Sequence, residues 1–393
     1  MLGSLFDTDL YKLTMGQFVN QFYPRAQVDY TLRFRTDVKF DKEVLQALQQ
    51  NLQSMQRLTA PASELNYLKK RCGHYLNDPY LIFLKGCSFD LGDIHAWTDH
   101  DDKLHCEIVD VPWYKGIYWE VPLMATIAES YFETIAPLSQ AQLDAAGEKA
   151  CRKAEQMRQI GAPFIEMGTR RRRSYAVQDA VMRGLIEGGK EVFLGTSNVH
   201  FANKYDIAAH GTMAHELFSA VAAMHGVEKA NNTVLGRWAE LYHGHLGIAL
   251  PDTFTSEFFR QSFDAFHAKL FDGVRQDSGD PFEFIDRFVE HYQRLGIDPR
   301  TKKLVFSDGI NSMDLVDRIV EYCDGKAIPS FGIGTYLTND FDDVQALNMV
   351  IKLTAARENI FQLKRAAIKL SDSPGKYSGD LAVVADYLRR IAA

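Results

Sequence analysis

The sequence has few cysteines, and their spacing argues against two common ways of stabilising a domain. Only five occur among 393 residues, and no two stand close enough to form a CxxC pair. An odd, scattered set of thiols is typical of a reduced compartment and indicates neither a disulfide framework nor a structural zinc site. We therefore expect a cytoplasmic protein with free thiols.

The chain also lacks the segments that direct proteins into or across membranes. Its N-terminus has no basic region and meets Asp7 and Asp9 early, unlike a signal peptide. It contains no run of about 18 apolar residues, so we expect no membrane span. A formal net charge of −7 gives no reason to expect a nucleic-acid partner. Local basic groups could still bind small anions.

Apolar residues, in contrast, are plentiful enough for a large core. Hydrophobic residues make up 46% of the chain and charged residues 24%, which is ordinary for a globular protein. The length exceeds one average domain and suits a barrel with an additional layer.

The first third of the chain predicts an α+β module, which we place at residues 1–135. Asp7-Thr8-Asp9 precedes an apolar helical pattern, as at a helix N-cap. Residues 28–35 alternate apolar and polar, which predicts a half-buried antiparallel strand. Residues 41–80 predict helices, and residues 81–122 predict short strands before a helix resumes near Val121.

A helix predicted at 139–160 introduces a different pattern, which we place at residues 136–345. Short apolar runs recur, each ending in Gly or polar residues and each followed by a helical pattern. The seven runs are 163–168, 191–195, 207–215, 246–250, 270–275, 304–307 and 327–332. This is a β/α series. A doubly wound sheet would fit, but we favour a barrel, because a barrel gathers all its strand ends around one mouth.

Residues 346–393 form a third part that we expect to fold back onto the N-terminal module. Residues 348–353 and 365–370 predict the two strands of a hairpin, and residues 371–376 predict a turn.

The predicted strand ends carry basic groups, carboxylates, small hydroxyls and glycine loops. His215 ends the third run, where barrel enzymes place their chemistry. Asp277 and Asp308 offer the oxygen ligands that Mg²⁺ prefers. Barrels often bind phosphate after the last strand through backbone N–H groups at a helix start. Here Gly332-x-Gly334-Thr335 occupies that place, and residues 337–347 could supply the helix. The set suits a phosphorylated, anionic substrate with magnesium.

Each of these features also has a plainer explanation. His215 could be a hydrogen-bonded core histidine. Four consecutive arginines, residues 170–173, usually form a solvated face, although at least one should point inward if a strand ends there. Glycine pairs mark many turns, and residues 275–280 could be a capped turn with a surface ion pair. The combination is more specific than its parts, because seven separate strand ends agree in chemistry.

Eight motifs in this sequence resemble those of the nicotinate phosphoribosyltransferases of NAD salvage, the NAPRTase family. They run nearly end to end and in the family's order. The motifs are Asp7 to Tyr11, Glu166 to Arg170, Gly195 to Asn198, Gly211 to Glu216, Val274 to Asp280, Ser307 to Gly309, Phe331 to Thr335 and Lys369 to Lys376.

The resemblance implies an α/β fold: an irregular α/β barrel, as in type II phosphoribosyltransferases, with an α+β sandwich domain formed by both chain ends. It implies a homodimer with sites at the interface. The implied reaction converts nicotinate, 5-phosphoribosyl-1-pyrophosphate (PRPP), ATP and water to nicotinate mononucleotide, pyrophosphate, ADP and phosphate, with Mg²⁺.

The resemblance also implies roles for individual residues. His215 matches the family's autophosphorylated histidine. Tyr11, Thr212 and Arg275 match positions that contact nicotinate. To this nicotinate-binding set we add Arg170, whose charge suits a carboxylate or nearby phosphates, and Ser197. The PRPP and phosphate set comprises Gly309, Gly332, Gly334 and Thr335, and the metal set comprises Asp277 and Asp308. We further expect Lys369 and Lys376 to reach a pyrophosphate across the dimer interface.

Chemical arguments add three expectations. A neutral imidazole is a competent nucleophile toward the γ-phosphate of ATP. A carboxylate should orient its other ring nitrogen, but the sequence does not identify it, and Glu216 should face away from His215 if the strand continues. Relatives that use nicotinamide carry an acidic residue near the position of Ser197, so a neutral serine favours nicotinate.

Three other functions stay open from the sequence. A nicotinamide phosphoribosyltransferase is the nearest alternative. A non-catalytic phosphoprotein could sense ligands through the same barrel mouth. A barrel lyase or isomerase would need a base or a Schiff-base lysine at a strand end, and we find none.

Overall fold

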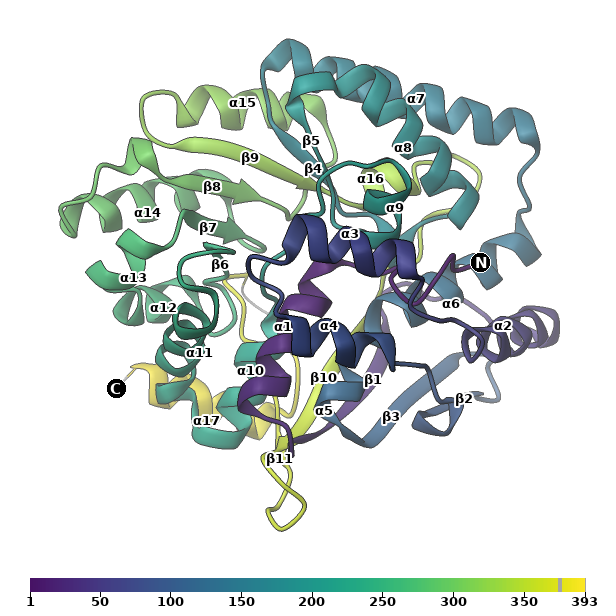
Figure 1. Ribbon diagram of the computed structural model, residues 1–393, viewed down its shortest axis with the longest axis horizontal. Coiled ribbons are helices and arrows are strands. Elements are labelled where there is room, and N and C mark those ends of the chain that lie inside the picture. Colours follow the sequence, from purple (N-terminus) through teal and green to yellow (C-terminus); the bar gives the residue numbers. More distant parts are fainter. Residues whose placement is uncertain (374–376, 393) are drawn as a thin grey trace.

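Two sheets organise the fold (Figure 1), which the computed structural model describes for residues 1–373 and 377–392. One is a five-stranded antiparallel sheet with the order β11-β10-β1-β3-β2. The other is a six-stranded parallel sheet with the order β5-β4-β9-β8-β7-β6. In Figure 1 the parallel sheet occupies the upper part of the molecule and the antiparallel sheet the lower right. The chain is therefore a mixed α/β protein.

Both ends of the chain build the antiparallel sheet. Its strands are β1 (Gln27–Phe34), β2 (Ile94–Thr98), β3 (Leu104–Pro112), β10 (Met349–Arg357) and β11 (Arg365–Ala366). Strand β1 pairs antiparallel with β3 and with β10, and buried residues alternate along most of it. The predicted antiparallel strand at 28–35 is thus confirmed. The predicted C-terminal hairpin is confirmed in part: β10 pairs with β11, but β11 covers only Arg365–Ala366 of the run predicted at 365–370, and its partners are Ala355 and Ala356.

Helices cover one face of this sheet and extend from it. They are α1 (Leu10–Phe22), α2 (Lys42–Met55), α3 (Ala62–Cys72), α4 (Asp78–Lys85), α5 (Trp113–Gly116) and α6 (Glu120–Ile135). The prediction of strands from residue 81 is wrong at its start, because residues 81–85 belong to α4. The Asn77 side chain accepts a hydrogen bond from the Tyr80 N–H, and Pro79 stands in the first turn. These capping signals outweigh a short apolar run that resembles a strand.

Six of the seven predicted runs form strands of the parallel sheet. These strands are β4 (Phe164–Glu166), β5 (Phe193–Thr196), β6 (Ile248–Ala249), β7 (Gly273–Gln276), β8 (Lys303–Phe306) and β9 (Ile328–Ile333). The helices around them are α7 (Gln140–Ile160), α8 (Tyr175–Gly189), α9 (Val199–Lys204), α10 (His215–His225), α11 (Val227–Tyr242), α12 (Ser256–Ser262), α13 (Ala265–Leu270), α14 (Pro281–Arg294), α15 (Met313–Cys323) and α16 (Thr335–Thr338). The helix predicted at 139–160 is confirmed as α7.

The strand predicted at 207–215 is wrong, because this segment is irregular. Ala209 forms a single parallel bridge with Thr196 of β5, and the Thr212 hydroxyl donates to the Ile248 carbonyl of β6 over 2.8 Å. The segment therefore lies between the two end strands and closes the sheet into an irregular barrel. It is also confined by α1, since a Cβ on Gly211 would lie 2.6 Å from the Tyr11 nitrogen. In this segment, close packing against α1 takes the place of regular hydrogen-bonded pairing between strands.

The helix expected at 337–347 is much shorter than predicted, because α16 ends at Thr338. The Asn339 side chain donates to the Arg171 carbonyl over 2.9 Å, and Asp343 binds the guanidinium of Arg173. Asn and Asp favour such side-chain bonds over helix interiors. These contacts turn the chain toward β10.

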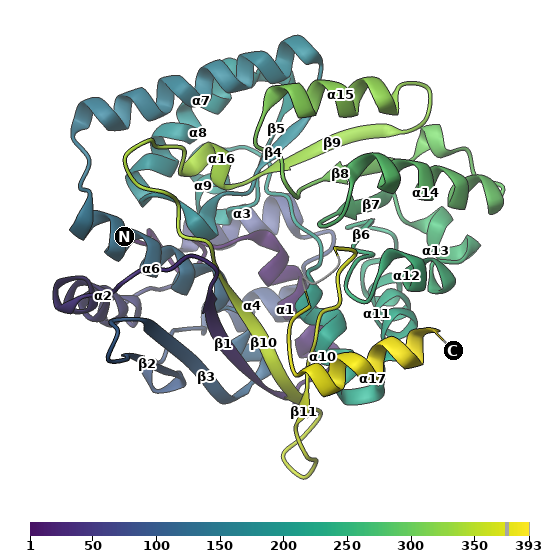
Figure 2. The same ribbon diagram turned by 180° about the vertical axis from the view of Figure 1, so that it is seen from behind.

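The C-terminal segment contributes to both halves of the molecule. Strand β10 joins the antiparallel sheet, whereas α17 (Leu381–Ala392) packs against α11 on the barrel side (Figure 2). The predicted turn at 371–376 includes residues 374–376, which lie outside the described residues, as does the call on Lys376.

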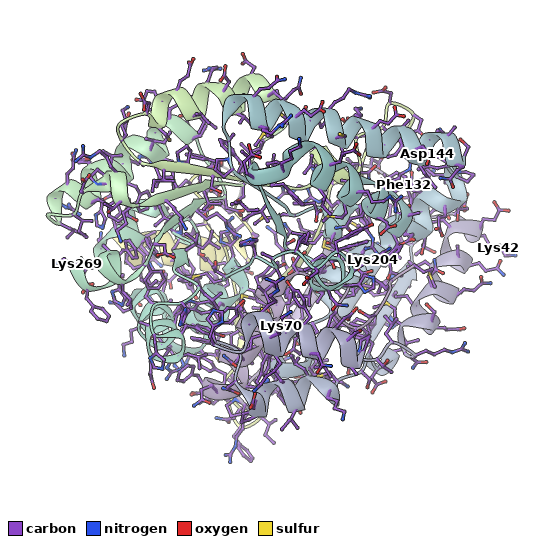
Figure 3. All side chains as sticks on the ribbon, turned by 45° about the horizontal axis from the view of Figure 1, so that its top comes forward. Lys42, Lys70, Phe132, Asp144, Lys204 and Lys269 are labelled. Atoms are coloured by element: carbon purple, nitrogen blue, oxygen red, sulfur yellow. The ribbon has the colours of Figure 1, made fainter. Side chains whose placement is uncertain are left out.

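Side chains fill the space between these layers. Figure 3 shows charged residues such as Lys42 and Lys70 at the surface, whereas Phe132 of α6 is only 1% exposed. Within residues 1–373 and 377–392, no helix combines the length and apolar character needed to cross a membrane. Helix α10 packs against β10, so it joins the barrel to the antiparallel sheet.

Candidate active site

A cavity of about 460 Å³ lies where the barrel mouth meets the antiparallel sheet. The barrel contributes the carboxyl ends of β4, β7, β8 and β9 together with the start of α10. The antiparallel sheet contributes Tyr30 of β1 and residues 350–353 of β10. Because the walls come from both sheets, only the folded chain brings these groups together.

Most of the residues singled out from the sequence line this cavity. They are Tyr11, Arg170, His215, Arg275, Asp277, Asp308, Gly309, Gly332, Gly334 and Thr335. Ser197 and Thr212 are not among the lining residues.

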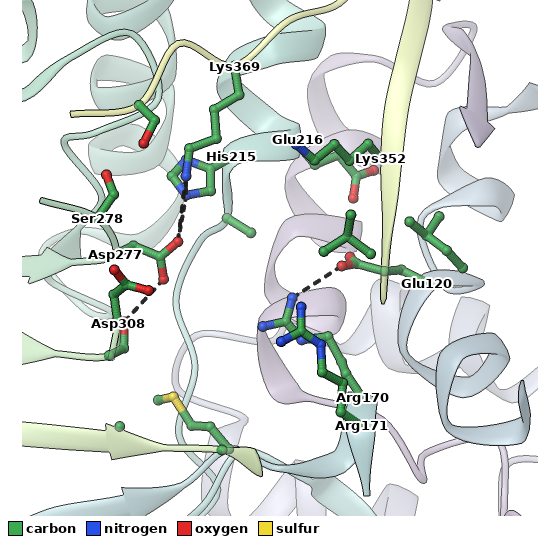
Figure 4. Close-up of a pocket in the computed structure, with 18 of the residues that line it drawn as sticks. Glu120, Arg170, Arg171, His215, Glu216, Asp277, Ser278, Asp308, Lys352 and Lys369 are labelled. Atoms are coloured by element: carbon green, nitrogen blue, oxygen red, sulfur yellow. Dashed lines mark hydrogen bonds and ion pairs between the residues drawn. The ribbon is translucent and has the colours of Figure 1, made fainter. Parts of the chain in front are cut away.

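The imidazole of His215 has polar neighbours at both ring nitrogens (Figure 4). Nε2 lies 2.8 Å from Oδ2 of Asp277 and 2.7 Å from Nζ of Lys369, and Nδ1 lies 2.9 Å from the Thr253 hydroxyl. The carboxylate partner that the sequence could not identify is thus Asp277. Burial, and next the positive charge of Lys369, lower the pKa of His215 below its ordinary value. The ring is therefore neutral at neutral pH.

Asp277 is an ionised carboxylate at this site. Burial alone would raise its pKa, but Arg275, His215 and Lys369 together hold the pKa of Asp277 well below its ordinary value. Its other oxygen accepts a hydrogen bond from the Ser307 hydroxyl over 3.2 Å. The anion is therefore fixed by groups from β7, β8, α10 and the C-terminal segment.

A second carboxylate, Asp252, completes a cluster with His215 and Asp277. One potential ligand atom from each lies within 4.8 Å of the others. Oδ1 of Asp252 is buried and has no hydrogen-bond partner in the described part of the chain. A buried acceptor without a partner is costly unless a cation or water satisfies it. With Asp308 on the same cavity, this donor set fits Mg²⁺.

The glycine loops bring backbone close to the cavity. A Cβ on Gly332 would lie 2.6 Å from Sδ of Met167, so a larger residue would displace the floor of the site. Gly309 has a φ of 70°, which disfavours residues with a side chain. These positions leave backbone N–H groups within reach of a ligand.

The four consecutive arginines have three different environments. Arg170 and Arg171 line the cavity, whereas Arg172 and Arg173 are buried in ion pairs with Asp7 and Asp343. The interpretation of residues 170–173 as a solvated face is therefore wrong for Arg172 and Arg173. Their buried charges are tolerated because each guanidinium meets a carboxylate.

The N-terminal Asp7-Thr8-Asp9 motif does not cap α1 through a side chain. Asp9 stands at the N-cap position but makes no side-chain capping hydrogen bond. Its Oδ1 instead accepts a hydrogen bond from the Ser197 hydroxyl over 2.7 Å. Ser197 is 3% exposed, its hydroxyl is hydrogen-bonded to Asp9, and it does not line the cavity. The structure therefore shows no contact through which this serine would select nicotinate over nicotinamide. The Thr212 hydroxyl is likewise committed to the Ile248 carbonyl.

Sequence reasoning missed a buried lysine and two carboxylates beside the cavity. Nζ of Lys12 lies 2.6 Å from Oε2 of Glu120 and 2.6 Å from Oε2 of Glu216. The argument that Glu216 faces away from His215 assumed a strand, whereas both residues begin helix α10; Glu216 nevertheless contacts Lys12 and not His215, and it lines the cavity. The signal available was a lysine inside an otherwise apolar helical pattern.

Comparisons with known proteins agree with this architecture over the whole chain. Residues 163–391 match the nicotinate phosphoribosyltransferase (NAPRTase) family, and residues 6–128 match the NAPRTase N-terminal domain. Nicotinate phosphoribosyltransferases of Desulforapulum autotrophicum and Chromohalobacter salexigens are each 42% identical, over 97% of this chain and 96% of their own. The crystal structure of the Porphyromonas gingivalis nicotinate phosphoribosyltransferase superposes with a TM-score of 0.95 at 33% identity, covering 100% of both chains. The Vibrio cholerae nicotinate phosphoribosyltransferase structure gives 0.91 at 32% identity, covering 100% of this chain and 94% of its own.

Proposed function

The chain belongs to the nicotinate phosphoribosyltransferase (NAPRTase) family, and from this premise we propose that it makes nicotinate mononucleotide from nicotinate and PRPP, coupled to ATP hydrolysis. The observation that carries the proposal is the shared cavity. It combines a neutral histidine, two carboxylates and a lysine with two arginines that suit an anionic ring substrate.

Arg170 and Arg275 would bind the nicotinate carboxylate. The Arg170 side chain is 45% exposed, and its ion pair with Glu120 spans 3.4 Å, so its guanidinium can bind a further anion. Nε of Arg275 is buried and has no hydrogen-bond partner within the described residues. Guanidinium groups bind carboxylates through strong charge-assisted hydrogen bonds. A nicotinamide amide carries no charge for them, which favours nicotinate.

The opposite side of the cavity suits the phosphates of PRPP and ATP. Gly309, Gly332, Gly334 and Thr335 offer backbone N–H groups and a hydroxyl at the barrel mouth. Lys352 of β10 lines the same cavity, and burial, followed by the nearby Arg35 and Lys369, lowers the pKa of Lys352 to about 8. A bound phosphate would stabilise the charged form of this lysine.

Magnesium would be held by Asp277 and Asp308, with Asp252 as a further oxygen ligand, and it would neutralise charge on the pyrophosphate. The residues of the chain then have one main task in the transfer step. They hold the pyridine nitrogen in line with the anomeric carbon while the bond to pyrophosphate breaks.

His215 would couple ATP to this step through a phosphohistidine. Nε2 carries the ring proton and donates it to Asp277, so Nδ1, beside the Thr253 hydroxyl, is the bare nitrogen that forms a bond to the γ-phosphorus as the bond to the ADP oxygen breaks. Water later displaces the imidazole and releases phosphate. Until then the phosphohistidine adds negative charge at the cavity, by analogy with other phosphorylated residues.

The division into residues 1–135, 136–345 and 346–393 is part of the proposal, as are a homodimer and a cytoplasmic location. The pairing of β10 with β1 supports a sandwich domain built from both chain ends. The five free cysteines support a reducing compartment. Analytical ultracentrifugation would test the homodimer.

Product analysis tests the proposed function directly. Purified protein with nicotinate, PRPP and Mg²⁺ should form nicotinate mononucleotide, and ATP should increase the yield. Replacing nicotinate by nicotinamide should lower kcat/KM by at least about 100-fold, because the arginines that line the cavity then lack their anion. Equal turnover of the two substrates would contradict the choice of nicotinate, and absence of product from both would contradict the proposed function.

Replacing Lys369 by glutamine should raise the pKa of His215. A neighbouring cation disfavours imidazole protonation, so removing it makes the charged form more stable. Asp252 and Asp277 remain and act in the same direction. The pH at which ATP-dependent phosphorylation fails on acidification should therefore move upward. Titration of the His215 ring by NMR measures this, with the exposed Lys269→Gln as control, and an unchanged or lower midpoint would contradict it.

A further inference from the structure

We propose that Lys12 is a positioning residue that couples the nicotinate end of the cavity to the His215 end, an inference that rests on the proposed function. Its ammonium is completely buried, with its side chain 0% exposed, and it contacts one carboxylate from each end of the cavity. It touches neither His215 nor the expected substrates. Its effect would therefore pass through Glu120 and Glu216.

Glu120 connects Lys12 to the nicotinate end. Its Oε1 lies 3.4 Å from Arg170, and its Oε2 accepts a hydrogen bond from the Tyr11 hydroxyl over 3.3 Å. Figure 4 shows Arg170 directed at Glu120 across the cavity wall. A nicotinate carboxylate at Arg170 would compete with Glu120 for the same guanidinium.

Glu216 connects Lys12 to the histidine. It follows His215 in the first turn of α10, so both side chains depend on the position of the same helix start. Its Oε1 accepts hydrogen bonds from the Tyr30 hydroxyl and from Nε1 of Trp113. Tyr30 and Trp113 hold Oε1 of Glu216, so Lys12, at Oε2, is the partner of Glu216 whose contact can change.

The four ionised groups balance one another. Lys12 and Arg170 supply two positive charges, and Glu120 and Glu216 supply two negative charges. Lys12, Glu120 and Glu216 are largely shielded from water, so the two ion pairs of Lys12 depend strongly on each other, whereas the Arg170 guanidinium at the end of the chain of charges is reached by ligands. When a substrate anion binds Arg170, Glu120 is released toward Lys12, and the ammonium shifts away from Glu216. This partner exchange would change the start of α10, and hence the presentation of His215, when nicotinate is bound.

Coupling of this kind acts in both directions. If nicotinate changes the affinity for ATP, ATP must change the affinity for nicotinate by the same factor. In the wild-type protein we expect each ligand to change the dissociation constant of the other by at least about five-fold. Calorimetric titration with nicotinate and a non-hydrolysable ATP analogue with a β,γ-imido group measures this factor without turnover.

The test compares Lys12→Met with the double variant Lys12→Met/Glu216→Gln. The double variant removes one charge of each sign and leaves the Arg170–Glu120 pair intact, so it preserves charge balance where the single variant does not. We expect the double variant to bind nicotinate and the ATP analogue, but each ligand should leave the dissociation constant of the other nearly unchanged, which is a coupling factor near one. ATP hydrolysis should then no longer respond to nicotinate, and more ADP should form per nicotinate mononucleotide.

The control is Lys302→Met, which also places methionine at a buried lysine. Lys302 precedes β8, is 8% exposed, and donates to the backbone carbonyls of Lys269 and Phe271 near the end of α13, away from the barrel mouth. Its coupling factor should equal that of the wild type. Wild-type coupling in the double variant would overturn the proposal, because it would show that Lys12 only balances charge. Absence of mutual effects in the wild-type titration would overturn it as well. Failure of the proposed function would appear separately, as absence of nicotinate mononucleotide from the wild-type enzyme.

Discussion

Replacement of His215 by alanine should abolish covalent labelling of the protein by ATP that carries a radioactive γ-phosphate. Nicotinate-dependent ATP hydrolysis should fall by at least about 100-fold, since the protein loses its phosphate acceptor. Formation of nicotinate mononucleotide from nicotinate and PRPP without ATP should change much less. Filter binding of the labelled protein and separate assays of ADP and nicotinate mononucleotide measure the three quantities.

The expected asymmetry follows from where His215 lies. Its Nε2 faces Asp277 and Lys369, whereas Arg170 and the loop with Gly332 and Gly334 belong to other walls of the cavity. The groups that would hold the ring substrate and the ribose phosphate therefore do not depend on the imidazole. Removing the imidazole should therefore abolish the coupling of ATP hydrolysis to the reaction and leave the groups that bind nicotinate and PRPP in place.

The chemistry of the label separates His215 from its neighbours. A phosphohistidine is labile in acid and stable in base, whereas an acyl phosphate on Asp252 or Asp277 would be labile in base. The control is His210→Ala, in the irregular segment that precedes α10. The His210 ring nitrogen Nε2 lies 3.0 Å from the Leu194 carbonyl oxygen, and its side chain does not line the cavity. Wild-type labelling in His215→Ala, or a base-labile label in the wild type, would contradict the assigned role.

The sequence predicted the parallel strands because their pattern is local. Short apolar runs ended by Gly or polar residues gave six strands of the barrel. The run at 207–215 has the same composition, but its small residues allow neighbouring segments to approach closely and do not form a strand. A Cβ on Gly195 would lie 2.1 Å from the Ala208 carbonyl oxygen, and Gly211 packs on α1. That close approach between distant segments cannot be seen from local periodicity.

The candidate site was predictable where residues stand at strand ends, and not where a side chain's direction depends on distant partners. Asp277 and Thr335 follow strands and therefore reach the barrel mouth. Ser197 also follows a strand, but its hydroxyl is drawn to Asp9, which is 188 positions away in the sequence. Lys12 and Glu216 are separated by 204 positions, so their contact required the fold.

Replacing Arg172 by methionine should destabilise the protein by about 3–5 kcal/mol, because it leaves a buried carboxylate without its cation. Both Arg172 and Asp7 have side chains that are 0% exposed, and the guanidinium donates to the two Asp7 oxygens over 2.9 and 3.0 Å. Glu129 lies 3.6 Å away and would lose the same cation. The first transition in urea denaturation, followed by circular dichroism, measures the loss.

The size of this effect can be separated from that of an ordinary ion pair by two further variants. Arg183→Met removes the pair with Asp179, whose arginine side chain is 59% exposed, and should change stability by less than about 1 kcal/mol. Arg172→Met/Asp7→Asn removes both buried charges and should recover part of the loss.

Burial alone would raise the pKa of Asp7, but Arg172 holds it below its ordinary value. The wild type should therefore lose this stabilisation as the pH falls through that lowered pKa, and the double variant should not. A loss below 1 kcal/mol in Arg172→Met would show that the N-terminal motif does not anchor the chain to the barrel.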